Sequence, residues 1–218
     1  MTVFLPGYMS DMEGGKAQAL FAAEKARGRA CLLLDYSGCG HSSGEFADGT
    51  LTRWRDEVLA LIEAHGGGPV ILVGSSMGGW LMLLCALRLG ARVKGLVGIA
   101  AAPDFSCWGY DAVQKAQLAD GITVLEENPY SPEPVPTHPL FWQDAETRLL
   151  LGSPIPIDCP VRLLHGQEDR EVPPEISLRL AEALHSEDVQ VTLVKNGDHR
   201  LSRESDIALL LHAVASLD

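Results

Sequence analysis

The sequence has no apolar run long enough to cross a membrane, and it has few basic residues. In this 218-residue chain the longest mostly apolar stretch, Trp80 to Leu87, is far shorter than the ~20 residues that a membrane-spanning helix needs. The 17 Lys and Arg residues are outnumbered by 29 Asp and Glu residues, so the formal net charge is −12. Because such a chain repels phosphate backbones and anionic lipid surfaces, we expect no nucleic-acid partner and no membrane span.

The five cysteines form neither a disulfide pattern nor a metal-binding pattern. They are odd in number, widely scattered and without a C-x-x-C pair, and the seven histidines show no H-E-x-x-H spacing. The first residues, MTVFLPGY, lack the basic region and the long apolar core of a signal peptide. We therefore expect a cytoplasmic protein that binds no metal and needs no cofactor.

The composition and the order of apolar segments are those of a globular α/β protein. Hydrophobic residues make up 46% of the chain and charged residues 21%, and the length favours one domain over residues 1–218. Short apolar runs alternate with longer segments of helical period, which predicts a mostly parallel central sheet with helices on both faces. The predicted strands are Val3–Leu5, Ala30–Asp35, Val70–Val73, Val93–Ile99, Val161–Leu164 and Val189–Leu193. The predicted helices are Gly14–Arg27, Leu51–His65, Ser76–Leu89, Pro174–His185 and Ser202–Leu217.

One segment, at about residues 103–160, interrupts this alternation. It is rich in proline and aromatic residues and has little periodicity, and long connections of this kind are often lids over a binding site. The alternative is a structural excursion that packs its aromatic side chains on the core. If the segment is a lid, five aromatic residues are candidates for the walls of an apolar substrate pocket: Phe105, Trp108, Tyr110, Phe141 and Trp142.

Gly74-Ser75-Ser76-Met77-Gly78 matches the G-x-S-x-G pattern of a nucleophile elbow. It follows an apolar strand and opens an apolar helix, the strand–turn–helix context in which the serine hydroxyl projects from a strained turn. Gly40-His41-Ser42-Ser43-Gly44 matches as well, but a polar loop follows it instead of a helix. The context favours Ser76 over Ser42 as the nucleophile.

A nucleophilic serine needs a base, and the base needs an acid that orients it. In doubly wound hydrolases these residues follow the serine in the order acid, then histidine, beyond the ends of later strands. Asp169 comes just past the predicted strand ending at Leu164, and His199 comes past the next one. We expect His165, which precedes the acid, to order the turn. Three other carboxylates remain alternatives to Asp169: Glu168, Glu171 and Asp158.

Two backbone N–H groups are needed to stabilise the oxyanion of a tetrahedral intermediate. Met77 directly follows the candidate nucleophile, and the loop after the first predicted strand, Pro6 to Ser10, offers Tyr8. The alternative for this loop is a simple turn.

Together these motifs resemble the α/β-hydrolases across nearly the whole chain. Longer strings resemble one subfamily, the mitochondrial palmitoyl-protein thioesterases, also described as mycophenolic acid acyl-glucuronide esterases, and their bacterial esterase relatives. The resemblance implies an α/β-hydrolase fold, a Ser76, Asp169 and His199 triad, and hydrolysis of carboxylic esters or acyl thioesters. The strings are Phe4-Leu5-Pro6-Gly7-Tyr8-Met9-Ser10-Asp11-Met12, Asp35-Tyr36-Ser37-Gly38, Gly74 to Met82, Ser153-Pro154-Ile155-Pro156, Cys159 to Gly166 and Asp198-His199-Arg200.

The sequence thus predicts a serine hydrolase acting on small-molecule acyl esters or thioesters. A serine peptidase on the same scaffold and a non-catalytic ligand-binding protein are the alternatives, since fold does not determine function. The chain begins almost within its first predicted strand, so the edge strands usual in these relatives are missing or lie upstream of Met1. With no transit peptide at this start, we expect the cytoplasmic location and not a mitochondrial one.

Overall fold

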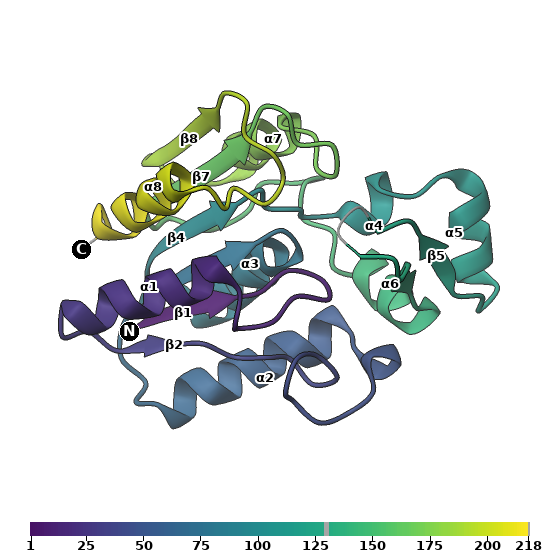
Figure 1. Cartoon of the computed structure of the whole chain (residues 1–218), viewed down its shortest axis with the longest axis horizontal. Coiled ribbons are helices and arrows are strands. Elements are labelled where there is room, and N and C mark those ends of the chain that lie inside the picture. The colour runs from purple at the N-terminus through teal and green to yellow at the C-terminus, as the bar shows by residue number, and fades with distance from the viewer. Residues whose placement is uncertain (129–130, 218) are drawn as a thin grey trace.

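Six strands form the central sheet of this computed structural model, which describes residues 1–128 and 131–217 (Figure 1). Their spatial order is β2-β1-β3-β4-β7-β8, and each neighbouring pair is parallel, which confirms the predicted sheet. The strands are β1 (Thr2–Leu5), β2 (Cys31–Leu32), β3 (Val70–Ser75), β4 (Val93–Ile99), β7 (Val161–Gly166) and β8 (Val189–Val194). The strand order reverses between β1 and β3, where the carboxyl ends of open α/β sheets commonly bind ligands.

Helices cover both faces of the sheet, and alternate strand residues pack into two separate cores. Leu5 and Leu72 belong to one buried cluster, whereas their neighbours Phe4 and Val73 belong to the other. The first core is covered by α2 (Leu51–Ala64), α3 (Met77–Leu89) and α7 (Glu175–Ala183). The second core is covered by α1 (Gly15–Ala26) and α8 (Glu204–Ala215).

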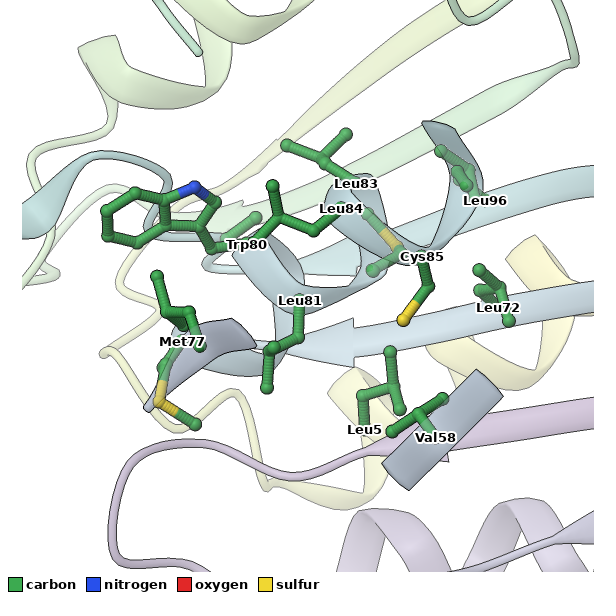
Figure 2. Packing of buried hydrophobic residues seen from close by; sticks show 14 of the residues in the cluster. Leu5, Val58, Leu72, Met77, Trp80, Leu81, Leu83, Leu84, Cys85 and Leu96 are labelled. Atoms are coloured by element: carbon green, nitrogen blue, oxygen red, sulfur yellow. The ribbon is translucent and has the colours of Figure 1, made fainter. Parts of the chain in front are cut away.

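Helix α3 is apolar on nearly all sides and lies within the first core. Figure 2 shows its side chains between strand residues such as Leu72 and Leu96 and the α2 residue Val58. Trp80 and Leu81 have no exposed surface, and a helix that is apolar all round is stable in water only when it is enclosed in this way. This burial fixes the position of the helix N-terminus, and with it the turn that contains Ser76.

Most predicted boundaries differ from the observed ones by one to three residues, and two of the differences have a clear physical reason. β2 ends at Leu32, short of the predicted Asp35, because Asp35 accepts hydrogen bonds from the backbone N–H groups of Met12 (2.7 Å) and His41 (2.9 Å) and so organises a loop at the sheet edge. α3 begins at Met77 and not at Ser76, since Ser76 has the non-helical dihedral angles φ 54° and ψ −121°.

The segment at 103–160 contains its own secondary structure, apart from residues 129 and 130, which lie outside the described residues. Figure 1 shows it as a compact insertion at one side of the sheet. β5 and β6 pair antiparallel. Its elements are α4 (Phe105–Trp108), α5 (Ala112–Ala119), β5 (Val124–Glu126), β6 (Val135–Thr137) and α6 (Pro139–Glu146). Elsewhere the chain forms two short 3₁₀ helices, η1 (Phe46–Asp48) and η2 (Gly90–Arg92).

Asp104 joins the two ends of the insertion. Its buried carboxylate accepts hydrogen bonds from the backbone N–H groups of Leu150 and Leu151, both at 2.7 Å. Its φ of 60° is left-handed, a conformation that aspartate tolerates better than most residues. Within the described residues, no helix is both long enough and apolar enough to span a bilayer.

Candidate active site

Ser76 lies in a strained turn between β3 and α3. Its φ of 54° is left-handed, which is costly for a residue with a side chain and requires support from its surroundings. The Ser76 N–H donates to the Ile99 carbonyl (2.9 Å), and its carbonyl accepts from Gly79 (2.8 Å) and Ala102 (3.0 Å). These bonds leave the hydroxyl projecting at the carboxyl end of the sheet.

The glycines of the elbow are required by close backbone contacts. A methyl group at Gly78 would overlap the carbonyl oxygens of Leu5 and Pro6, and one at Gly74 would overlap the carbonyl oxygen of Gly78. Helix α3 therefore begins directly against the end of β1. Only residues without a Cβ allow this approach.

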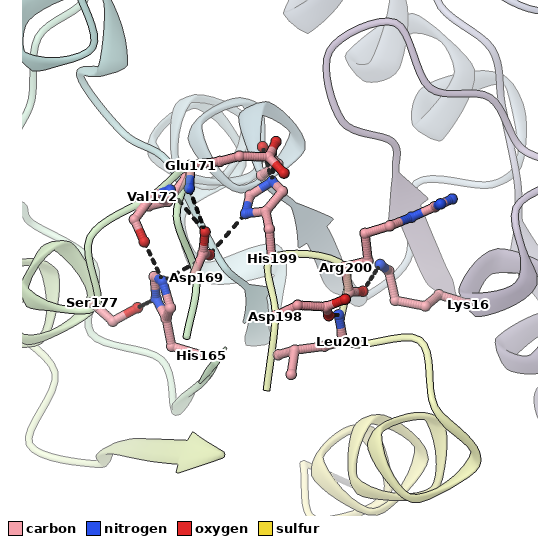
Figure 3. Close-up of polar contacts among 11 residues, drawn as sticks. Lys16, His165, Asp169, Glu171, Val172, Ser177, Asp198, His199, Arg200 and Leu201 are labelled. Carbon is pink, nitrogen blue, oxygen red and sulfur yellow. Dashed lines mark hydrogen bonds and ion pairs between the residues drawn. The ribbon is translucent and has the colours of Figure 1, made fainter. Parts of the chain in front are cut away.

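The structure brings Ser76, His199 and Asp169 together. The Ser76 Oγ lies 3.1 Å from His199 Nε2, and His199 Nδ1 lies 2.8 Å from Asp169 Oδ2. Because a carboxylate can only accept, Nδ1 carries the proton and Nε2 is left to accept from the serine hydroxyl. Figure 3 shows the His199 ring beside the Asp169 carboxylate. The three side chains come from the ends of β3, β7 and β8, as the sequence order predicts.

The Asp169 and His199 loops meet through glycine. A methyl group at Gly166 would overlap the carbonyl oxygens of Gly197 and Asp198. The Glu168 N–H donates to the Gly197 carbonyl at 2.9 Å and joins the two loops directly. This contact sets the spacing between the acid and the imidazole.

Asp169 is held as a carboxylate by four donors. Its Oδ1 accepts from the backbone N–H groups of Glu171 and Val172, both at 2.9 Å, and its Oδ2 lies 3.1 Å from His165 Nε2 as well as near His199. Burial raises the pKa of Asp169, but the hydrogen bonds from His165 and His199 outweigh it, so the net pKa lies well below the usual range. The side chain is suited to stay ionised beside an imidazolium.

His165 is fully buried and supports the Asp169 turn. Its Nε2 lies 2.9 Å from the Val172 carbonyl, and its Nδ1 lies 2.7 Å from the Ser177 Oγ (Figure 3). The sequence predicts that His165 orders the turn, but it indicates neither the contact with Asp169 nor the one with Ser177. The position of His165 at the end of an apolar strand was the sequence pattern that indicated its role in the turn. Ser177 lies on α7, and no pattern in the sequence indicated that it would contact His165.

The other candidate acids do not contact His199 Nδ1. Glu171 Oε2 lies 3.8 Å from Nε2, the nitrogen on the serine side. Glu168 and Asp158 are exposed. Among the carboxylates considered in the sequence, only Asp169 hydrogen-bonds the nitrogen that an orienting acid uses.

Tyr8 and Met77, the expected oxyanion donors, lie on the two segments that border Ser76. A methyl group built on Gly7 would lie 3.4 Å from the Ser76 Cβ, so the loop after β1 runs beside the serine. Within the described residues the N–H groups of Tyr8 and Met77 donate to no other group. The Tyr8 hydroxyl donates to the Pro136 carbonyl at 3.0 Å, which ties this loop to the insertion.

The five aromatic residues expected to line a pocket are mostly used in packing. Phe141 is only 1% exposed, and its ring centroid lies 5.7 Å from that of Phe105. The Tyr110 hydroxyl is 2.8 Å from the Thr137 Oγ1. Both tryptophan indole N–H groups donate to carbonyls, Trp108 to Pro103 (2.9 Å) and Trp142 to Ser106 (3.2 Å). Their role as pocket walls stays a prediction.

A cavity of about 410 Å³ adjoins the loop after β1 (residues 6–10), which we call the oxyanion loop because Tyr8 is an expected oxyanion donor. None of these five aromatic residues lines the cavity. Burial raises the pKa of the lining thiol of Cys39 to about 11, so it is a poor nucleophile near neutral pH. Within the described part of the chain, no group of three His, Cys, Asp or Glu side chains is arranged to hold a metal ion. The cavity is lined by Met9, Asp11, Gly38, Cys39, Gly40, Glu45, Phe46, Ala47, Pro136 and His138.

Known proteins resemble this chain over almost its whole length. Palmitoyl-protein thioesterase ABHD10, mitochondrial, of Homo sapiens is 41% identical over 220 residues, which cover 99% of this chain and 72% of the relative. The solved structure of alpha/beta hydrolase domain-containing protein 10 from mouse has a TM-score of 0.91 and 40% identity, covering 99% of this chain and 88% of that one.

The expected cytoplasmic location is contradicted by this comparison. The human and mouse relatives are both named as mitochondrial proteins. The expectation depended partly on scattered cysteines, which indicate a reducing compartment without distinguishing one such compartment from another.

The family is shown by both sequence and fold. Paleococcus ferrophilus monoacylglycerol lipase shares the fold, with a TM-score of 0.82 at 19% identity over 100% of this chain and 94% of that one. Residues 2–211 match the alpha/beta hydrolase family. With this match, the parallel sheet and the serine turn between β3 and α3, the chain belongs to the alpha/beta hydrolase family.

Proposed function

We propose that this chain is a serine hydrolase that cleaves acyl thioesters or carboxylic esters through an acyl-enzyme intermediate. The observation that carries the proposal is the hydrogen-bonded series of Ser76, His199 and Asp169, with distances of 3.1 and 2.8 Å. A serine hydroxyl becomes a nucleophile when a neighbouring base accepts its proton and a third group orients that base.

In the proposed first half-reaction, the Ser76 Oγ attacks the acyl carbonyl carbon while its proton passes to His199 Nε2. The bond to the leaving group then breaks, and Nε2 returns the proton to the departing thiolate or alkoxide. In the second half-reaction, water attacks the acyl-enzyme by the same route and releases the carboxylic acid. Asp169 stabilises the imidazolium in both halves, and its lowered pKa keeps it ionised.

The negative oxygen of each tetrahedral intermediate needs donors that are already in position. We propose the N–H groups of Tyr8 and Met77 for this role, since both border Ser76 and neither is used elsewhere in the described residues. The Met77 N–H also stands at the N-terminus of α3, where the helix dipole favours negative charge. Each such donor contributes about 10²–10³ to the rate in enzymes where it has been removed.

We further propose that the insertion at 103–160 acts as a lid that shapes the substrate site. It contacts the oxyanion loop through the Tyr8–Pro136 hydrogen bond and through the packing of the Tyr8 and Phe141 rings, whose centroids are 4.9 Å apart. The relatives support the proposed substrate class, because the human protein is named as a palmitoyl-protein thioesterase.

Replacing the candidate nucleophile tests the proposal. Hydrolysis of a p-nitrophenyl ester and of an acyl thioester is measured for the wild type and Ser76→Ala. We expect kcat/KM to fall by at least about 10⁴-fold with both substrates, because the variant cannot form the acyl-enzyme. Labelling by a fluorophosphonate probe disappears in parallel, whereas failure of the wild type to be labelled favours the non-catalytic alternative.

Ser42→Ala is the matched control. Ser42 lies in the second G-x-S-x-G match, but its hydroxyl donates to the Asp35 carbonyl at 2.8 Å, and its turn is followed by the short 3₁₀ helix η1 and not by an α-helix. We expect both rates to stay within about twofold of wild type, as for most substitutions away from a site. Equal rates for Ser76→Ala and wild type would contradict the assignment.

A further inference from the structure

The carboxylate of Glu171 lies beside the nitrogen that transfers the proton in the proposed mechanism. Its Oε2 is 3.8 Å from His199 Nε2, and the same nitrogen is 3.1 Å from the Ser76 Oγ. Figure 3 shows Glu171 reaching over the imidazole ring from another side than Asp169. Glu171 thus faces the reacting side of the ring, whereas Asp169 contacts the opposite nitrogen.

The origin of the Glu171 side chain is fixed by the same turn that holds the acid. Its backbone N–H donates to Asp169 Oδ1 at 2.9 Å, and the next residue, Val172, makes the equivalent bond and is buried. Glu171 is an exposed residue, with 40% of its side chain accessible to water and the remainder covered. Because it is partly shielded from water, its charge is screened less than that of a fully exposed group.

The mechanism places the leaving group close to this charge. His199 Nε2 must lie within about 3 Å of the sulfur or oxygen that it protonates. With Oε2 at 3.8 Å from Nε2, the leaving atom lies no farther than roughly 7 Å from the Glu171 carboxylate. At that distance a unit charge on the leaving group interacts measurably with Glu171.

The cavity that adjoins the oxyanion loop, which neither Ser76 nor Glu171 lines, carries charge of the same sign. Asp11 and Glu45 line the 410 Å³ cavity beside the oxyanion loop, and its described lining residues include no lysine or arginine. The whole chain has a formal net charge of −12, although Lys16 and Arg200 lie near the His199 loop.

We infer that Glu171 is a specificity-determining residue that disfavours anionic leaving groups and favours cationic ones. The inference rests on the proposed function and adds a class of substrate to it: esters or thioesters whose alcohol or thiol part is neutral or positively charged near the scissile bond.

Three thioesters with one acyl group and differently charged thiols test the inference. They are S-butyryl thiocholine (cationic), S-butyryl N-acetylcysteamine (neutral) and S-butyryl 3-mercaptopropionate (anionic). Each kcat/KM is compared between wild type and Glu171→Gln, so that the intrinsic reactivity of each thioester cancels. We expect the variant to gain roughly three- to tenfold on the anionic thioester and to lose a similar factor on the cationic one. The neutral thioester stays within about twofold.

Glu168→Gln is the matched control, because Glu168 is an exposed carboxylate in the same turn. We expect this variant to leave the kcat/KM of all three thioesters unchanged relative to wild type, and we expect about 0.5 M salt to reduce the Glu171 effect.

Two results overturn the inference. If Glu171→Gln changes kcat/KM by the same factor for all three thioesters, Glu171 acts only through the imidazole. If it changes none of them, Glu171 does not act. Glu171→Ala repeats the comparison in case the glutamine variant folds poorly. Absence of Ser76-dependent cleavage of any thioester would instead count against the proposed function.

Discussion

Asp169 combines a proposed chemical role and a structural role in one carboxylate. Two imidazoles and two backbone N–H groups point at it, and they stabilise its ionised form against the cost of burial. The same contacts hold the turn that carries Glu171, so acid, imidazole and proposed specificity residue form one connected unit. Substitutions within such a unit are not expected to be additive.

Stability at low pH follows from the lowered pKa of Asp169. A carboxyl group whose folded pKa lies below its ordinary value near 4 stabilises the protein fully above that value, and this contribution is lost as the pH falls toward the folded pKa. Asp169→Asn cannot ionise at this position. Between about pH 5 and pH 2, we expect the free energy of unfolding to fall more steeply for wild type than for this variant.

Urea unfolding at each pH measures the free energy of unfolding of both proteins. Because all other titrating groups are shared, the difference between the two pH profiles reports on Asp169 alone. At neutral pH we also expect Asp169→Asn to lower kcat/KM on the order of 10³–10⁴-fold, because its amide does not favour the correct imidazole tautomer. Parallel pH profiles for the two proteins would show that Asp169 has no lowered pKa.

At the scale of the elements, strands and helices determine where the reactive loops begin. α3 must start at the end of β1 because Gly78 allows its backbone to touch that of Leu5. β7 and β8 run parallel and in register, from Val161 opposite Val189 to Gly166 opposite Val194, so the loops that follow them meet. The insertion contacts the sheet domain at several places, and one side chain joins its two ends.

That side chain is Asp104, which accepts two hydrogen bonds across the ends of the insertion. We expect Asp104→Ala to destabilise the protein by about 1–3 kcal/mol, since it leaves the N–H groups of Leu150 and Leu151 without their acceptor. Amide hydrogen exchange within residues 105–151 should quicken, and urea unfolding gives the total loss.

Asp104→Asn is the comparison for this variant. Asparagine keeps one acceptor oxygen and tolerates the left-handed backbone, so we expect a smaller loss of stability and less exchange in the insertion. If the alanine and asparagine variants unfold at the same urea concentration, the hydrogen bonds that Asp104 accepts from Leu150 and Leu151 contribute nothing to stability.

At the scale of the whole molecule, two cores stabilise the sheet against the self-repulsion of an acidic chain. With a formal net charge of −12, like charges are crowded when the chain is compact. Raising the salt concentration from about 20 to about 200 mM shortens the range of this repulsion. At neutral pH we expect the melting temperature to rise by about 2–5 °C.

The same salt series near the isoelectric point provides the control. At a pH close to the sequence value of 4.9, the net charge is near zero and the repulsion is largely removed. We expect the melting temperature to respond little to salt there. An equal rise at both pH values would indicate a general salt effect unrelated to net charge.

The fold and the candidate residues were accessible from local patterns in the chain. Apolar runs and helical periods predicted each strand of the central sheet. Burial on both faces requires such runs in β1, β3, β4 and β7, whereas the edge strands β2 and β8 are only partly buried. The context of Gly74 to Gly78 singled out Ser76, and the strand ends singled out Asp169 and His199. These inferences need only neighbours in the sequence, a chain order and the resemblance to known hydrolases.

Distances between loops depended instead on packing that no local pattern encodes. The side on which Glu171 approaches His199, the contact of Ser177 with His165 and the burial of Phe141 all arise where segments distant in sequence meet. The proposed chemistry could therefore be predicted from the residue types and their order in the sequence. The proposed preference for cationic leaving groups depends on where the Glu171 side chain lies in the folded protein. Charges interact according to the distance between them and not according to their separation along the chain.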